Sequence, residues 1–132
     1  FNLALGNKND ILDFFIATSG GDSSIIRPKV FSEIKKVDVL KLDSLIVNLK
    51  IKKIKLLKVE AEGYEPEVLL GAKDSLKICD YVAVDGGYER GLKEEQTFTE
   101  ITNYLIKNGF DIFDIYFPWN RALFKNSLLS KN

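Results

Sequence analysis

The chain has 132 residues, of which 45% are hydrophobic and 29% are charged, as is usual for one globular domain. The 19 basic residues balance the 19 acidic residues, so the overall charge gives no reason to expect binding to nucleic acid or to an anionic membrane. The single cysteine, Cys79, and the lack of histidine exclude an internal disulfide, a Cys/His zinc site and a histidine-dependent triad.

The sequence also bears on location and completeness. No run of about 18 apolar residues is present, so we expect no membrane span, and no signal peptide is visible, which makes a cytoplasmic location the default. The chain starts at Phe1 and contains no methionine, so we expect it to be part of a longer protein. Cys79 lies in an apolar stretch, where we expect a buried structural thiol.

The first third of the chain predicts strands separated by polar turns. Residues 1–5 resemble the end of a strand, and residues 11–17 form a second strand candidate. Residues 18–24 are rich in glycine and serine and predict a loop. The apolar positions of residues 36–42 predict a further strand.

The middle of the chain alternates helix and strand. Asp43 is a candidate N-cap for a short amphipathic helix. Residues 54–59 form a near-continuous apolar run, which predicts a mostly buried parallel strand. Pro66 suits the first turn of a following helix, and residues 81–84 predict another buried strand.

The last third predicts a helix and a hairpin. The helix covers residues 94–108, with Gly109 as its C-terminal stop. Residues 110–117 alternate as a half-buried strand, 118–121 form a turn, and 122–124 close a hairpin that would add an antiparallel edge strand. The alternation predicts a single α/β domain, a three-layer sandwich with a largely parallel sheet and an antiparallel C-terminal hairpin.

Acidic side chains cluster where the strand of residues 54–59 should end. Glu60, Glu62 and Glu65 lie within six residues, and ligands of open α/β sheets bind at the carboxyl ends of strands. Glu60 and Glu62 alternate, so we expect both to point to the same side. They would hold substrate hydroxyls, a cofactor ammonium group or a divalent cation; alternatively they are a solvated strand end that stabilises the next helix.

Other residues near this strand end have competing interpretations. Gly63 permits a tight turn or the close approach of a ligand, and Glu65 is better explained as a helix N-terminal acid. Asp85 ends the next strand, where it would act as a general base or simply form a turn. Arg90 would grip an anionic substrate or pair with Glu89 on the surface.

Aromatic residues complete the predicted site. Tyr88, Tyr116 and Trp119 are candidates to line an acceptor pocket, although aromatic residues near strand ends more often pack in the core or at its rim. We therefore predict Glu60, Glu62 and Asp85 as catalytic, Tyr88 and Arg90 as substrate-binding, and no metal site.

Four segments together resemble the FkbM-type methyltransferases. They are residues 42–45 (LDSL), 57–72 (LKVEAEGYEPEVLLGA), 84–91 (VDGGYERG) and 119–124 (WNRALF). The second segment is the most specific, and it carries Glu60 where the family usually has aspartate.

The resemblance implies a Rossmann-like methyltransferase fold that lacks its first strands here. It implies S-adenosylmethionine as cofactor, with Glu62 and Gly63 at the cofactor, and O-methylation of a sugar, glycolipid or small metabolite. The family's glycine-rich cofactor loop does not occur in these residues, so we expect the chain alone to be a poor enzyme.

Two alternatives remain open. The first is a non-catalytic α/β module that forms a homodimer, because an exposed apolar sheet edge favours pairing with another copy. The second is a sugar- or nucleotide-binding domain without methyl transfer.

Overall fold

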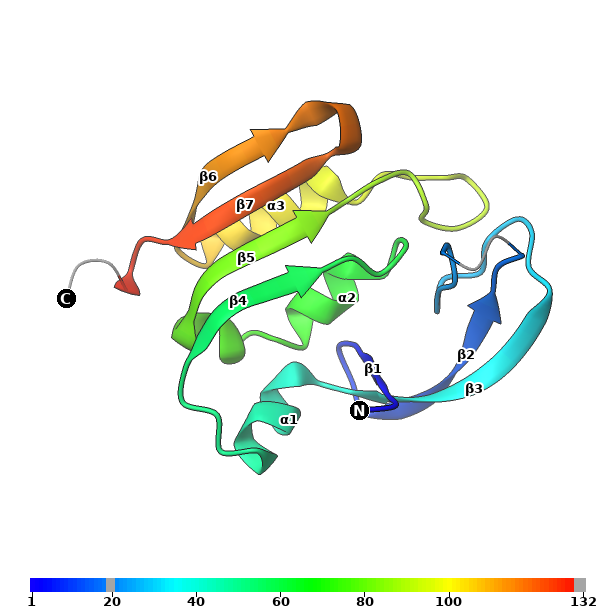
Figure 1. Ribbon diagram of the computed structural model, residues 1–132, viewed down its shortest axis with the longest axis horizontal. Coiled ribbons are helices and arrows are strands. Elements are labelled where there is room, and N and C mark those ends of the chain that lie inside the picture. Colours follow the sequence, from blue (N-terminus) through cyan, green and yellow to red (C-terminus); the bar gives the residue numbers. More distant parts are fainter. Residues whose placement is uncertain (19–20, 130–132) are drawn as a thin grey trace.

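The computed structural model describes residues 1–18 and 21–129, which form a mixed α/β fold with two sheets (Figure 1). The strands are β1 (Ala4–Leu5), β2 (Asp10–Ile16), β3 (Glu33–Leu40), β4 (Ile54–Val59), β5 (Cys79–Asp85), β6 (Phe110–Tyr116) and β7 (Arg121–Asn126). The helices are α1 (Leu42–Asn48), α2 (Glu65–Leu70) and α3 (Phe98–Lys107), with 3₁₀ turns η1 (Ser75–Ile78) and η2 (Phe117–Trp119). The α/β class predicted from the sequence is confirmed.

The smaller sheet has the order β1-β3-β2 and extends to one side of the molecule (Figure 1). β2 and β3 are antiparallel, and β1 is parallel to β3. Both longer strands lie where the sequence predicted them, although β3 begins three residues earlier than residue 36. Of the predicted loop 18–24, residues 19 and 20 lie outside the described residues, and Ser24 exchanges main-chain hydrogen bonds with Phe15.

The larger sheet has the order β4-β5-β7-β6. β4 and β5 are parallel, whereas β7 is antiparallel to both of its neighbours. The hairpin and the antiparallel edge strand that it adds were predicted correctly, and the edge strand is β6. β7 takes the inner position because Ala122, Phe124 and Asn126 are buried against the helices, whereas most of β6 is exposed.

The largely parallel, three-layer arrangement is not confirmed. Among the described strands two pairings are parallel and three are antiparallel. Helices α2 and α3 lie on one face of the larger sheet (Figure 1), and the opposite face is open. Leu56 is 54% exposed, so the prediction that β4 is mostly buried is wrong: a strand is buried on both faces only when helices cover both.

The core lies between the larger sheet and its helices. Its fully buried side chains include Leu69, Leu76, Val82, Ile101, Leu105, Phe110 and Phe124. The apolar residues of α3 recur at helical spacing and face this core, as predicted. This packing fixes the carboxyl ends of β4 and β5 relative to α2 and α3.

Two helix starts differ from the sequence predictions. Lys41, not Asp43, is the N-cap of α1; the Asp43 carboxylate instead accepts hydrogen bonds from the N–H groups of Asp74 and Ser75 at the start of η1. Helix α3 begins at Phe98 rather than residue 94, because the main chains of Arg90 and Glu95 pair and fold the preceding segment into a loop. The predicted stop at Gly109 is confirmed by its φ of +86°.

Candidate functional site

The residues that follow β4 form a tight acidic turn. We call residues 60–65 the acidic turn. Glu62 and Gly63 have φ values of +48° and +93°, so two consecutive residues adopt left-handed backbone conformations. A non-glycine residue rarely does so, and such strain is found where the surrounding structure enforces it. Helix α2 then begins at Glu65 with Pro66 in its first turn, as predicted.

Glu65 stabilises the acidic turn from inside. Its side chain is only 1% exposed. One carboxylate oxygen accepts hydrogen bonds from the N–H groups of Ala61 (2.8 Å) and Gly63 (3.0 Å), and the other accepts one from the Thr97 hydroxyl (2.8 Å). Glu65 is therefore the helix N-terminal acid that the sequence favoured, and it also fixes the turn.

Ser24 holds the same turn from the smaller sheet. Its hydroxyl oxygen lies 3.2 Å from the carbonyl oxygen of Ala61 and 2.8 Å from that of Glu62. Ser24 is 3% exposed, so its hydroxyl is shielded from competing water. The position of the Glu62 backbone thus depends on a residue 38 positions away in sequence.

Arg90 holds the turn from a third side. Its guanidinium donates to the carbonyl oxygen of Gly63 (2.5 Å) and makes a two-pronged contact with the Glu67 carboxylate at 2.9 and 2.6 Å. The side chain is thus engaged within the protein, which disfavours the predicted role of gripping an anionic substrate. Its ion-pair partner is Glu67, not Glu89 as the alternative interpretation proposed.

Gly63 leaves no room for a ligand on the side that faces Arg90. A Cβ atom at this glycine would lie 2.7 Å from the Arg90 Cα. The sequence predicted that glycine permits either a tight turn or the close approach of a ligand. The tight turn is present, and the group that approaches Gly63 closely is the Arg90 backbone. Any role for Gly63 at a cofactor must therefore use its other side.

A pocket of about 480 Å³ opens beside the acidic turn. Glu60, Glu62 and Asp85, the three predicted catalytic residues, all line it. The exposed rings of Tyr88 and Trp119 also line it. Its acidic lining residues are Asp22, Glu60, Glu62, Glu65, Asp85 and Glu89. The structure therefore gathers the predicted acids and two of the three predicted aromatic residues at one site.

Glu62 has the most perturbed carboxyl group in this pocket. Partial burial raises its pKa from 4.5 to about 7, and the nearby carboxylates of Glu89 and Asp22 add to the effect. Burial likewise raises the pKa of Glu89. A carboxyl group that titrates near neutral pH is suited to accept a proton under physiological conditions.

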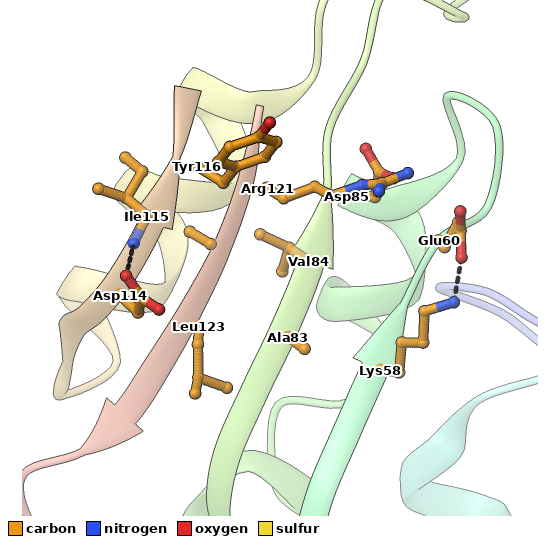
Figure 2. A pocket seen from close by; sticks show the side chains of 11 residues that line it. Lys58, Glu60, Ala83, Val84, Asp85, Asp114, Ile115, Tyr116, Arg121 and Leu123 are labelled. Atoms are coloured by element: carbon orange, nitrogen blue, oxygen red, sulfur yellow. Dashed lines mark hydrogen bonds and ion pairs between the residues drawn. The ribbon is translucent and has the colours of Figure 1, made fainter. Parts of the chain in front are cut away.

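Glu60 and Asp85 each have a basic partner. The Lys58 ammonium contacts the Glu60 carboxylate and lowers the pKa of Glu60 (Figure 2). The Asp85 carboxylate accepts a hydrogen bond from Arg121 Nε at 2.6 Å. Both carboxylates are thus charge-compensated by a basic side chain.

A second pocket of about 440 Å³ lies on the open face of the larger sheet. Figure 2 shows its residues projecting from β4, β5, β7 and β6. Glu60, Asp85 and Arg121 line both pockets, so these side chains lie at the boundary between the two. Tyr116 lines this second pocket rather than the acidic one.

Residues 1–18 and 21–129 contain neither a metal-binding cluster nor a membrane-spanning helix. No three Asp, Glu, His or Cys side chains in these ranges are arranged to hold a metal ion. No helix there is long and apolar enough to cross a membrane. Cys79 is buried, as predicted, and burial raises the pKa of its thiol.

Sequence reasoning missed the residues that hold the acidic turn. Ser24 and Thr97 reach it from loops, and Glu67 on α2 holds the Arg90 side chain that contacts it. Nothing in their local sequence marks these contacts. The sequence predicts Glu89 only as a surface ion-pair partner, whereas it lines the acidic pocket. Its position two residues after Gly87, which follows β5 closely, was the available signal that it belongs to the same strand-end site.

These features define an α/β protein with an acidic pocket at the carboxyl ends of two parallel strands. The family model of the Methyltransferase FkbM domain matches residues 2–112. The chain therefore belongs to the FkbM methyltransferase family, and the predicted resemblance is confirmed. Searches of curated proteins and of solved structures gave no match.

Proposed function

We propose that this chain forms the acceptor side of an S-adenosylmethionine-dependent O-methyltransferase, with Glu62 as the general base. The acceptor would be a hydroxyl of a sugar, glycolipid or small metabolite. Family membership supports methyl transfer. One observation carries the role of Glu62: its carboxyl group has a pKa of about 7 and lines an open pocket. The turn that bears this carboxyl group is rigidly held.

Methyl transfer to oxygen requires an acceptor that loses its proton as the new bond forms. The Glu62 carboxylate would take the hydroxyl proton, and burial of this group makes it a stronger base than an ordinary glutamate. Ser24, Glu65 and Arg90 hold the turn so that the carboxylate needs little reorganisation. Positioning of this kind supplies much of the rate enhancement in displacement reactions.

The acceptor would rest between the aromatic rings and the acids. Tyr88 and Trp119 offer flat apolar surfaces on which a sugar ring can pack, and carboxylates accept hydrogen bonds from its hydroxyl groups. Arg121 interacts with the Trp119 ring at 5.9 Å and with Asp85, and so fixes this end of the pocket. Glu60 and Asp85 would orient hydroxyl groups rather than remove protons.

The pocket fits one part of S-adenosylmethionine. When bound, this cofactor supplies a methyl group on a positively charged sulfur. Carboxylates of the acidic turn complement such a positive charge and that of an ammonium group. Glu62 and the open side of Gly63 are the residues that we assign to this contact.

We further propose that the chain is one α/β domain, and that additional strands pairing with the free edge of β4 complete its Rossmann-like sheet. Among the described strands β4 pairs only with β5, so its other edge is free to receive strands that carry the rest of the cofactor site. A homodimer through such an edge remains a prediction. Added strands and their helices would also supply the third layer.

The test uses the intact protein, S-adenosylmethionine labelled in its methyl group, and a panel of sugars, glycolipids and small hydroxylated metabolites. We expect methyl transfer to at least one acceptor, and a loss of about 10²–10⁴-fold in kcat for Glu62→Gln. S-adenosylhomocysteine keeps the ammonium group that Glu62 would contact, so it should bind more weakly to this variant, and kcat is therefore compared at saturating cofactor. Full activity of Glu62→Gln, or transfer to no acceptor, would contradict the proposal.

Glu100→Gln is the matched control. Glu100 is an exposed acid in the first turn of α3 and does not line the pocket. The same chemical change at this position should leave both methyl transfer and cofactor binding unchanged. An equal loss in both variants would indicate a general effect of charge rather than a base at Glu62.

A further inference from the structure

The segment between α1 and the end of β4 concentrates positive charge. Residues 44–58 contain five lysines and no acidic residue, although the whole chain has as many acids as bases. Residues 47–53 are exposed without interruption. We call residues 47–53 the basic turn. The balanced net charge therefore conceals a local segregation.

The lysines of the basic turn are poorly compensated. Among the described residues neither Lys50 nor Lys52 lies within ion-pairing distance of a carboxylate. Lys53 and the neighbouring Lys55 both approach the same carboxylate, that of Asp80, at 3.2 Å. The side chains of both lysines remain more than two-thirds exposed, at 68% and 78%. The segment thus presents a net positive surface.

The end of α1 holds this charge in a defined position. Lys50 has a φ of +56°, the N–H of Lys50 donates to the Val47 carbonyl, and the N–H of Ile51 donates to the Ile46 carbonyl. This is the Schellman arrangement, whose left-handed position is normally glycine. A lysine there bears backbone strain that glycine would avoid, and strain retained at a surface position is consistent with a use for its side chain.

Exposed aliphatic side chains lie among the lysines. Val47, Leu49 and Ile51 are 73%, 43% and 38% exposed. Such a mixture of lysine and aliphatic residues is typical of surfaces that rest on lipid, where the charge attracts anionic headgroups and the apolar groups enter the interface. The segment has no arginine and no aromatic residue, which are the side chains that nucleic-acid sites use for stacking and base contact.

We propose that the basic turn is a docking surface for an anionic lipid bilayer. Charge complementarity carries the proposal, together with the exposed aliphatic groups and the fixed position of Lys50. The basic turn and the acidic turn lie at opposite ends of β4 (Figure 1). Docking would therefore leave the acidic pocket about 20 Å from the bilayer surface, as expected for a strand of 6 residues.

The experiment measures co-sedimentation of the chain with vesicles of phosphatidylcholine alone and with about one-third phosphatidylserine, at about 50 mM and about 500 mM salt. We expect binding to the anionic vesicles at low salt and little binding to the neutral ones. Lys50→Gly with Lys52→Gln should lower the partition coefficient about twenty-five-fold, at roughly five-fold for each lysine. The glycine removes backbone strain, so this variant should fold at least as well as the original chain.

Lys93→Gln with Lys107→Gln is the matched control. Both lysines are exposed and neither is ion-paired among the described residues, but both lie outside the basic turn. This variant should retain vesicle binding. If this control lost as much vesicle binding as the first variant, the proposal would be contradicted, because lysines anywhere on the surface would then support binding equally.

The remaining outcomes also decide the matter. Val47→Asn with Leu49→Gln should weaken vesicle binding, which would support insertion of the aliphatic groups. No binding to anionic vesicles at low salt would overturn the proposal. Binding of a single-stranded oligonucleotide that depends on Lys50 and Lys52, without such dependence for vesicles, would overturn it in favour of nucleic acid.

Discussion

The two ends of β4 carry opposite charges and are held in different ways. At the carboxyl end, the acidic turn contains two left-handed residues and is fixed by Ser24, Glu65 and Arg90. At the amino end, the basic turn contains one left-handed residue, Lys50, and is fixed by main-chain hydrogen bonds at the end of α1. The first end is shielded by long-range contacts, whereas the second is open to solvent.

The difference shows how a protein makes a charge chemically reactive. Carboxylates that are crowded and partly removed from water acquire altered pKa values, as Glu62 does. Exposed charges interact mainly with distant or incoming groups and are screened by salt. The acidic end is therefore suited to proton transfer, and the basic end to electrostatic docking.

The largest expected effect is the loss of the buried acid that holds the acidic turn. Glu65→Ala leaves the N–H groups of Ala61 and Gly63 and the Thr97 hydroxyl without their acceptor. Each unsatisfied buried donor is costly, so we expect the free energy of unfolding to fall by about 3–5 kcal/mol. Urea denaturation measures this change.

Glu100→Ala is the comparison for that measurement. It removes an exposed acid from the first turn of another helix, and it should change stability by no more than about 0.5 kcal/mol. Similar losses in the two variants would mean that Glu65 does not fix the turn.

The second prediction concerns the backbone of the acidic turn. Gly63→Ala places a Cβ atom 2.7 Å from the Arg90 Cα at a φ of +93°. We expect a loss of about 2–4 kcal/mol, since the strained conformation and the clash both act against the folded state. Thermal unfolding of Gly21→Ala, which meets no atom within 4 Å, provides the control and should show little change.

The third prediction is a pH dependence that arises from Glu62. Its pKa is about 7 in the folded protein against 4.5 ordinarily, so between these values the folded chain keeps a proton that the unfolded chain has lost. The free energy of unfolding should therefore fall as the pH rises from 4.5 to about 7. Solvent screening at this partly exposed group reduces the loss to about 1 kcal/mol.

Glu62→Gln should reduce this pH dependence to the part that the raised pKa of Glu89 contributes, as urea denaturation across the pH range would show. Glu60→Gln is the contrast, because Lys58 lowers the pKa of Glu60. The stability that Glu60 contributes is present above its unfolded pKa and is lost only at more acidic pH. The decline in stability between pH 4.5 and 7 should therefore persist in Glu60→Gln. If the decline disappeared in that variant, Glu60 rather than Glu62 would be its source.

The smallest prediction concerns the basic turn. Lys50→Gly relieves the left-handed strain at a φ of +56° and should raise the free energy of unfolding by up to about 1 kcal/mol. Thermal unfolding of Lys52→Gln, which removes a charge without changing backbone strain, should show no such gain. A loss of stability in Lys50→Gly would mean that the Lys50 side chain contributes to folding.

The sequence predicted the centre of the site because the signals there are local. The apolar run of β4, the acids that follow it and Pro66 at the start of α2 lie within 13 residues. The strand, the strand-end position of the acids and the helix start lie where they were predicted, although β4 is more exposed than predicted. Which strand of the hairpin lies inside the sheet could not be predicted in this way, because it depends on which of the two buries more surface in the core.

The contacts that make the site rigid are also invisible in the local sequence. The Ser24 hydroxyl and the Arg90 guanidinium reach the acidic turn across 38 and 27 residues, and the Glu67 carboxylate that holds Arg90 lies 23 residues from it. The raised pKa of Glu62 arises from burial and from Glu89 and Asp22, so it too depends on the folded arrangement.

The most direct test is a titration of the Glu62 carboxyl group by carbon-13 NMR, with Glu62→Gln used to assign its resonance. We predict a midpoint near pH 7, as the crowded and partly buried position requires. A midpoint near the ordinary value of 4.5 would show that Glu62 is a solvated acid, and it would contradict its role as the base of this site.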